Sequence, residues 1–280
     1  MFRFTKMFCG GKGMTFNIPL RHKVPILMYH SISRFAQPKY RKLAIDPVAF
    51  ADQVKYLVDE NYTTLTITQF TQLIASRTTK IPERIVMLTF DDAFDDFYTD
   101  VFPLLRRHSL VATLYVPTAF VGDTSRWLWR DGEGARRLMT WDQLREVSAQ
   151  GIECGAHSHH HVELDLLSPS AAAKEIINSK ALLEQQLDQQ IFSFAYPYGY
   201  YNAFIRGVIQ QAGFSSACAV RYRRCSIEDD PFTLSRLAVT SDLSFEQFTN
   251  LVTGHSPELN VQYERLRALG WRWARKYLHQ

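Results

Sequence analysis

The sequence predicts an α/β protein that folds as a single irregular (β/α) barrel over about residues 20–255. Short apolar runs alternate with helical patterns, and repeated β-then-α units imply parallel strands with helices outside them. The polar motifs fall at the ends of predicted strands, and in α/β barrels the carboxyl ends of the strands carry the chemistry. An apolar content of 46% in 280 residues is ordinary for a globular chain and argues against disorder.

The predicted strands are short apolar runs, rich in β-branched and aromatic residues and bounded by turn residues. The run that begins at Val111 ends at Pro117, because proline cannot donate a hydrogen bond within a sheet. In chain order, the predicted strands cover residues 24–29, 85–90, 111–116, 152–156, 192–196, 215–220 and 234–240.

The predicted helices lie between these strands and begin at recognisable capping residues. Asp46 and Ser168 each precede a proline, which places an N-cap and a proline at the first helical position. Thr140 and Gln143 have the spacing of a capping box. In chain order, helices are expected from Asp46, after Thr68, over 98–108 with an interruption at Pro103, from Thr140 to Gly151, from Ser168 to Leu187, and over 202–212.

Cysteine spacing and charge exclude several classes of function. The four cysteines form no C-x-x-C pair, so we expect reduced thiols rather than a disulfide framework or a zinc-cysteine site. The net charge of +4 is modest, and no Lys/Arg cluster before residue 260 resembles a nucleic-acid footprint, so we expect no nucleic-acid partner. The cysteines are Cys9, Cys154, Cys218 and Cys225.

Two motifs at strand ends indicate metal-dependent chemistry. Asp91 and Asp92 end the run 85–90, and His157 and His161 follow the run that begins at Ile152. One carboxylate with two imidazoles is a common way to hold a catalytic divalent metal and leave a coordination position open. The spare carboxylate can act as the base that activates water. The pattern therefore indicates a metal-dependent hydrolase.

Each motif also has a simpler interpretation. Two aspartates at a strand end most often form a turn or a helix N-cap. We expect His159 and His160 to be solvated or to support the ligands. Asp95 and Asp96 are expected to be solvated charges on the following loop or helix start.

Taken together and in order, the motifs resemble the polysaccharide deacetylases of the NodB-homology type, carbohydrate esterase family 4. The resemblance covers roughly residues 24–240 and implies a distorted (β/α)7 barrel, an irregular variant of the TIM barrel. It is carried by three segments: Thr89-Phe90-Asp91-Asp92, His157-Ser158-x-x-His161 and Phe194-Ala195-Tyr196-Pro197-Tyr198-Gly199.

The resemblance also implies a role for each site residue. Asp91 is the general base, and Asp92, His157 and His161 bind the metal, which is Zn²⁺ or another divalent transition metal such as Co²⁺ or Ni²⁺. A backbone N–H near Tyr198 is expected to stabilise the oxyanion. The residues assigned to substrate binding are Tyr196, Pro197, Tyr198, Gly199 and Arg236.

The general acid is assigned from the start of the chain. Leu27-Met28-Tyr29-His30 resembles a circularly permuted subgroup, the exopolysaccharide N-deacetylases that act on poly-N-acetylglucosamine, in which this segment comes first. We favour His30 because the strand 24–29 aims it at the site. His255 remains the rival, since its position suits the unpermuted order of the family.

The sequence departs from the family pattern in two places. Ala195 stands where the third motif usually carries an arginine that contacts the base or orients the substrate, and Arg236 is a hypothetical replacement from a later strand. The family's tryptophan motif is also missing, which leaves the wall of the acetyl pocket undefined. Trp127 and Trp129 lie on the long loop 122–134, where either a binding role or a core role fits.

These features predict a hydrolase that removes N-acetyl groups from amino sugars, with N-acetylglucosamine-type units as the default, in a polysaccharide or its precursor. The bond cleaved is a carbon–nitrogen bond other than a peptide bond, and the pathway is that of a surface polysaccharide or exopolysaccharide. One alternative is an O-acetyl carbohydrate esterase or a small-amide hydrolase with the same site. Another is a catalytically weak sugar-binding pseudoenzyme, which the missing arginine keeps open.

The two ends of the chain carry separate expectations. Residues 1–19 are expected to form a flexible leader without the apolar run of a secretory signal, and the true start is either Met1 or Met14. Residues 256–280 are expected to form a basic amphipathic helix, whose part 263–280 can contact an anionic membrane, close the barrel or dimerise. We expect a cytoplasmic protein, with this helix as the candidate contact to the inner membrane face. The oligomeric state stays open.

Overall fold

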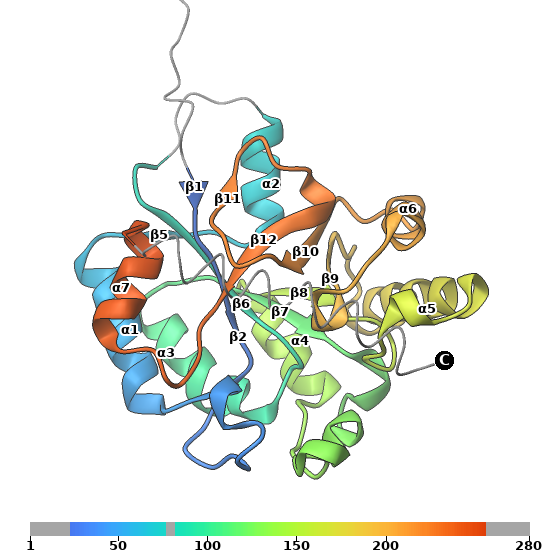
Figure 1. Cartoon of the computed structure of the whole chain (residues 1–280), viewed down its shortest axis with the longest axis horizontal. Helices are drawn as coiled ribbons and strands as arrows, with labels where there is room; N and C mark the ends of the chain where they lie inside the picture. The colour runs from blue at the N-terminus through green and yellow to red at the C-terminus, as the bar shows by residue number, and fades with distance from the viewer. Residues whose placement is uncertain (1–22, 77–81, 256–280) are drawn as a thin grey trace, which may run out of the picture.

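Seven parallel strands close into a barrel within the described residues, 23–76 and 82–255, of this computed structural model (Figure 1). Pairing of the first strand with the strand that ends at Phe90 closes the circle. This confirms the predicted (β/α)7 barrel. Around the barrel, the strands are β2 (Ile26–Tyr29), β12 (Leu234–Ala238), β10 (Ser216–Val220), β9 (Ser193–Ala195), β8 (Glu153–Ala156), β7 (Thr113–Val116) and β6 (Ile85–Phe90).

Shorter strands extend the two ends of the barrel. At the amino end, β5 (Thr63–Thr64) pairs with the start of β6, and β1 (Lys23–Val24) pairs with β11 (Cys225–Ser226) in antiparallel orientation. At the carboxyl end, β3 (Ser31–Ile32) pairs with β4 (Ala44–Ile45). The segment that follows β2 is therefore held in place directly beyond the barrel.

Helices surround the strands (Figure 1), and three of the seven described here begin at the caps predicted from the sequence. The Asp46 and Ser168 side chains accept hydrogen bonds from backbone N–H groups in the first turn, and Thr140 and Gln143 form the predicted capping box. The helices are α1 (Pro47–Asp59), α2 (Ile67–Ala75), α3 (Phe102–Arg107), α4 (Trp141–Ala149), α5 (Pro169–Leu187), α6 (Ala203–Gln211) and α7 (Phe245–Thr253).

Two helix boundaries differ from the sequence prediction. Helix α2 begins before Thr68, because Thr66 is its N-cap and forms a capping box with Gln69. The segment predicted over 98–108 is a π-helical turn, Phe97–Val101, followed by α3, with Pro103 in the first turn of α3, where its missing N–H is tolerated. Short 3-10 helices cover Arg41–Leu43, Thr118–Phe120, Arg126–Asp131, Leu164–Leu166, Pro197–Gly199 and Pro231–Thr233.

The side chains of the barrel strands alternate between the helix layer and the barrel interior. Along β6, Val86, Leu88 and Phe90 pack in the cluster under the helices, whereas Met87 packs in the interior cluster. Because side chains alternate along a strand, Asp91 continues the interior-facing series. Helix α2 contributes Ile67 and Phe70 to the interior cluster and so covers the amino end of the barrel.

The structure describes only part of what was expected for the cysteines and for the two ends of the chain. Cys154, Cys218 and Cys225 are buried free thiols, in agreement with the predicted reduced state, and Cys9 lies outside the described residues. Among the helices described within 23–76 and 82–255, none is long and apolar enough to cross a membrane. The leader 1–19 and the predicted helix over 256–280, with its membrane contact, also lie outside the described residues.

Candidate metal centre

Asp92, His157 and His161 meet at the carboxyl end of the barrel. Their ligand atoms all lie within 4.8 Å of one another, and all three residues are buried. Asp92 Oδ1 is 3.2 Å from His161 Nε2 and 3.8 Å from His157 Nε2. Asp92 follows β6 and both histidines follow β8, so the parallel strands bring the two motifs to one end of the barrel.

Left-handed backbone turns direct these side chains into the site. The φ angles are +76° at Asp92 and +50° at Ala93, and they are +59° at Ser158 and +52° at His161. Residues other than glycine adopt this conformation at a cost, and such residues cluster at functional sites. The polypeptide therefore accepts local strain in both segments that supply the candidate ligands.

The His157 ring is fixed by a backbone carbonyl. His157 Nδ1 lies 2.8 Å from the Ala195 carbonyl oxygen, which can only accept a hydrogen bond. Nδ1 therefore carries the proton, and the lone pair of Nε2 faces Asp92. Burial lowers the pKa of His157 to about 4, which keeps the ring neutral and able to bind a metal at neutral pH.

The chemistry of the three donors fits a divalent transition metal. Burial alone would raise the pKa of Asp92, but the neighbouring His161 lowers it to about 2, so the carboxylate is ionised. Asp92 Oδ1 is buried and has no hydrogen-bond partner among the described residues. One carboxylate oxygen and two imidazole nitrogens suit Zn²⁺ and related ions.

Asp91 is bound on both oxygens by Arg236. Nη1 of Arg236 donates to Oδ1 at 2.6 Å and Nη2 donates to Oδ2 at 2.8 Å. Arg236 is fully buried on β12, and its guanidinium lies 5.4 Å from the centre of the Tyr115 ring. Burial acts to raise the pKa of Asp91, but Arg236, together with His157 and His30, lowers it, so the carboxylate stays charged. Arg236 thus makes the contact that the sequence hypothesis gave it in place of an arginine at Ala195.

His30 lies at this site, and the rival His255 does not. The Asp91 N–H donates to the Tyr29 carbonyl at 2.9 Å, so His30 directly follows a residue joined to the Asp-Asp segment. The charge of a protonated His30 lowers the pKa of both Asp91 and Asp92. His30 Nδ1 is buried without a hydrogen-bond partner in the described chain.

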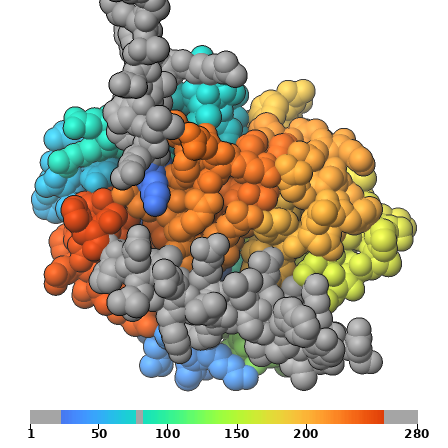
Figure 2. All heavy atoms as spheres, turned by 45° about the horizontal axis from the view of Figure 1, so that its top comes forward, coloured from blue at the N-terminus to red at the C-terminus, as the bar shows by residue number. Residues whose placement is uncertain are grey.

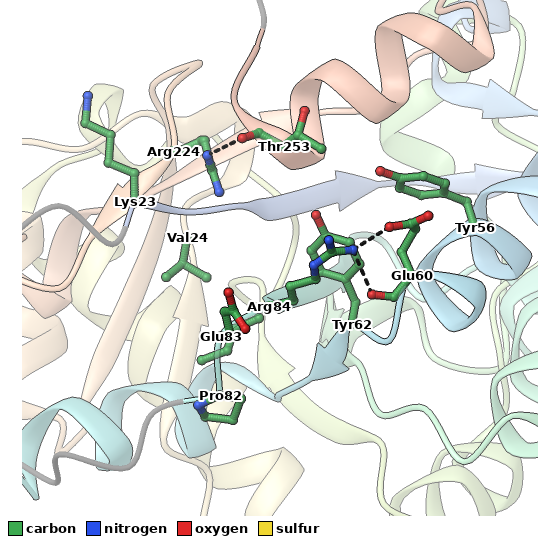
Figure 3. A pocket seen from close by; sticks show the side chains of 11 residues that line it. Lys23, Val24, Tyr56, Glu60, Tyr62, Pro82, Glu83, Arg84, Arg224 and Thr253 are labelled. Carbon is green, nitrogen blue, oxygen red and sulfur yellow. Dashed lines mark hydrogen bonds and ion pairs between the residues drawn. The ribbon is translucent and has the colours of Figure 1, made fainter. Parts of the chain in front are cut away.

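His255 belongs to the opposite end of the barrel. It is exposed and contacts Thr253 Oγ1 at 2.8 Å through Nδ1. Thr253 lines a pocket of about 280 Å³ together with Val24 of β1 and Ile85, the first residue of β6, both at the amino end of the barrel (Figure 3). In Figure 2 the start of the described chain, in blue, lies between the orange surface of the β10–β12 segment and α7. The pocket there is separate from the candidate metal centre.

Of the residues in the third motif, 194–199, some lie in the core and others lie beside the candidate metal centre. Tyr196 was expected to contact the substrate, but its side chain is fully buried and donates a hydrogen bond to the Phe232 carbonyl at 3.0 Å. Tyr198 is 45% exposed, and its ring lies 4.8 Å from the His161 ring. Pro197 and Gly199 are buried beside it. Of the two tyrosines in this motif, Tyr198 is therefore the one placed to meet a substrate.

The expectation that Asp96 is a solvated charge is wrong. Its Oδ2 accepts hydrogen bonds from Ser31 Oγ at 2.5 Å and Arg136 Nη1 at 3.3 Å, and only 13% of its side chain is exposed. Burial raises the pKa of Asp96 to about 6 in spite of these partners. Asp95 is half-buried and accepts from Gln143. No local pattern marks Arg136, so the sequence could not reveal this network.

The remaining histidines and tryptophans also have definite places. His159 contacts Thr118 Oγ1, and His160 is paired with Glu175, so neither is part of the ligand cluster. Trp127 stacks on the His161 ring, whereas Trp129 is 78% exposed. An aromatic side chain thus stands beside the candidate ligands, although the family's tryptophan motif is missing.

Comparison with known sequences identifies similar proteins. The sequence model of a family described as polysaccharide deacetylase matches residues 78–217, half of the chain. The chain is 28% identical over 226 residues to YxkH of Bacillus subtilis, named as a candidate polysaccharide deacetylase, covering 81% of this chain and 75% of that protein. It is 22% identical over 211 residues to the poly-beta-1,6-N-acetyl-D-glucosamine N-deacetylase of Staphylococcus aureus, covering 72% of this chain and 70% of that protein.

Solved structures share the fold. The deacetylase PplD of Streptococcus pyogenes, solved with acetate, matches with a TM-score of 0.71 and 27% identity, covering 84% of this chain and 99% of that one. IcaB of Ammonifex degensii matches with a TM-score of 0.71 and 22% identity, covering 82% of this chain and 96% of that one.

Proposed function

Because the chain belongs to the polysaccharide deacetylase family, we propose that it is a metal-dependent hydrolase that removes N-acetyl groups from amino sugars of a polysaccharide or its precursor. The observation that carries this proposal is the buried cluster of Asp92, His157 and His161. Asp91 lies directly beside the cluster, and His30 lies close enough for its charge to act on both aspartates.

Each site residue has a distinct task in this proposal. Asp92, His157 and His161 would hold Zn²⁺ or a similar ion such as Co²⁺ or Ni²⁺. A bound ion of this kind supplies Lewis acidity, which polarises an acetyl carbonyl and lowers the pKa of water. Asp91 accepts a proton from the attacking water, because each oxygen of a carboxylate keeps a lone pair after binding Arg236.

The leaving group and the developing charge need further donors. Protonated His30 donates its proton to the departing amine, which is a poor leaving group unless it is protonated. A backbone N–H near Tyr198 stabilises the negative charge that develops on the carbonyl oxygen. Tyr198, which is partly exposed beside His161, offers a face for a sugar ring.

Two observations bear on the substrate and on the alternatives. The similarity to an enzyme named as a poly-beta-1,6-N-acetyl-D-glucosamine N-deacetylase supports N-acetylglucosamine-type units. The sugar-binding pseudoenzyme alternative rested on the missing arginine at residue 195, and the contact between Arg236 and Asp91 supports the hydrolase proposal over it. Nothing in the arrangement favours the esterase alternative over the amidase.

Metal content and acetate release test the proposal together. Wild-type protein incubated with Zn²⁺ should retain about one ion per chain and release acetate from N-acetylglucosamine oligomers. Asp92→Ala should lose both properties, because one of the three ligands is gone. Asp142→Ala, which removes a carboxylate that is 91% exposed and lies outside the ligand cluster, is a control and should retain both. A wild-type protein that binds no metal and releases no acetate would contradict the proposal.

A further inference from the structure

The two histidines of the candidate metal centre are held in different ways. His157 Nδ1 has the Ala195 carbonyl oxygen at 2.8 Å as a hydrogen-bond acceptor. His161 Nδ1 is buried and has no hydrogen-bond partner in the part of the chain that the structure describes. A histidine that binds a metal usually donates its second N–H to an acceptor, which fixes the orientation of the ring. His161 therefore lacks the backbone contact that fixes the ring of His157.

Aromatic rings surround His161 instead. The Trp127 ring stacks on it, with the ring centres 4.9 Å apart and the planes 27° from parallel. The Tyr198 and His161 rings pack in a T-shaped arrangement, with the ring centres 4.8 Å apart and an angle of 71° between the planes. We propose that Trp127 is a positioning residue that orients His161 for metal binding, by stacking in place of a hydrogen bond. This inference rests on the proposed metal centre.

Trp127 is itself fixed by its neighbours, as a positioning residue must be. Its ring centre lies 4.8 Å from that of Phe120. It also stacks on Phe94, with the ring centres 6.4 Å apart and the planes 21° from parallel. Phe94 is buried and comes two residues after the candidate ligand Asp92. Trp127 therefore bridges the two segments that supply the ligands, the one after β6 and the one after β8.

The loop that carries Trp127 is anchored close to it. Ser125 is fully buried, and its hydroxyl lies within hydrogen-bond distance of the carbonyl oxygens of Glu133 and Arg136, at 2.6 and 3.1 Å. Arg136 in turn binds Asp96 and Ser31. Hydrogen bonds thus hold the base of the loop at the carboxyl end of the barrel. The Trp127 ring therefore has a defined position, and the His161 ring packs against it.

Trp129 provides a matched control on the same loop. It lies two residues after Trp127 and belongs to the same 3-10 helix, but 78% of it is exposed. No ring contact joins Trp129 to a candidate ligand within the described residues. Replacement of either tryptophan removes an indole from this loop, but only one replacement removes the stack on His161.

The test is a Zn²⁺ titration by calorimetry of wild type, Trp127→Phe, Trp127→Leu, Trp127→Ala and Trp129→Ala. Loss of a group that orients a metal ligand typically weakens affinity about 10- to 100-fold, and we expect a loss in this range for Trp127→Ala and Trp127→Leu. Trp127→Phe, which keeps an aromatic face, should retain most of the affinity, and Trp129→Ala should match wild type. Thermal melts with a chelator report on folding separately from metal binding.

The outcomes separate this inference from the proposed function. Wild-type affinity in Trp127→Leu, or equal losses in Trp127→Phe and Trp127→Leu, would overturn the positioning role while the metal centre stands. A wild-type protein that binds no Zn²⁺ would overturn the proposed function and the inference with it. If Trp127→Ala fails to fold, the comparison between Trp127→Phe and Trp127→Leu still decides.

Discussion

The ion pair between Arg236 and Asp91 makes a quantitative prediction possible. Arg236→Met keeps most of the side-chain volume but leaves the buried Asp91 carboxylate without its two charged donors. Removing one partner of a buried ion pair costs about 3–5 kcal/mol, because the remaining charge is desolvated and unpaired. In a domain of this size, each kcal/mol lowers Tm by about 2–4 °C. We therefore expect Tm of the metal-free variant at pH 7 to fall by about 6–20 °C.

The loss of stability in Arg236→Met should depend on pH in a defined direction. In wild type, Arg236 lowers the pKa of Asp91 against the effect of burial. The ionised carboxylate therefore stabilises the fold above its unfolded-state pKa of about 3.9, and this contribution is lost as pH falls through the folded-state pKa. Without Arg236, burial should raise the pKa of Asp91. The stability gap between the two proteins should then be largest near neutral pH and shrink as the variant's carboxyl becomes protonated.

Urea unfolding of chelator-treated protein, followed by circular dichroism, measures these differences. Arg236→Met, Asp91→Asn and the variant that carries both changes form a double-mutant cycle. The double variant should lose less stability than the sum of the two single losses, by about 0.5–3 kcal/mol. Arg84→Met is the control, because its ion pair with Glu60 is exposed and such pairs contribute about 0–1 kcal/mol. Simple additivity in the cycle, or a loss for Arg236→Met no larger than the control's, would refute the reasoning.

Three further predictions concern single residues of the site and its surroundings. Asp91→Asn should bind Zn²⁺ as wild type does but lose about 10²- to 10⁴-fold in acetate release, and an active variant would remove Asp91 from the role of base. His30→Ala should slow hydrolysis of N-acetyl substrates far more than that of O-acetyl esters, since an alkoxide leaves with less help from an acid; equal losses would contradict its role as acid. Burial raises the pKa of Asp96 to about 6, so the folded protein should lose stability as pH rises from about 4 to 6. Asp96→Asn should flatten that slope in urea titrations, and an unchanged slope would contradict this interpretation.

The candidate ligands could be predicted from the sequence because the signal is local. Each motif directly follows an apolar run that forms a strand, and parallel strands necessarily gather their carboxyl ends on one side. The helix starts at Asp46, Thr140 and Ser168 were predicted for a similar reason, since a capping side chain bonds to the backbone within the next three residues.

Errors arose where burial decided the outcome. Asp96 looks like a surface charge by residue type, and Tyr196 looks like part of a binding motif. Yet the first is buried against Arg136 and the second lies in the core. Neither residue type nor periodicity reports which side of a turn faces the interior, because that depends on segments that are distant in the chain.

The sequence by itself determined the barrel, the Asp-Asp and histidine motifs and the face on which they meet, since these depend on apolar periodicity and on contacts within a few residues. Only the tertiary structure decided how the motifs are supported. Arg236 reaches Asp91 across 145 residues and Arg136 reaches Ser31 across 105. Trp127 stacks on His161 from a separate loop. A side chain far away in the chain becomes a neighbour only when the barrel closes, and the pairing energy of such groups leaves no pattern along the sequence.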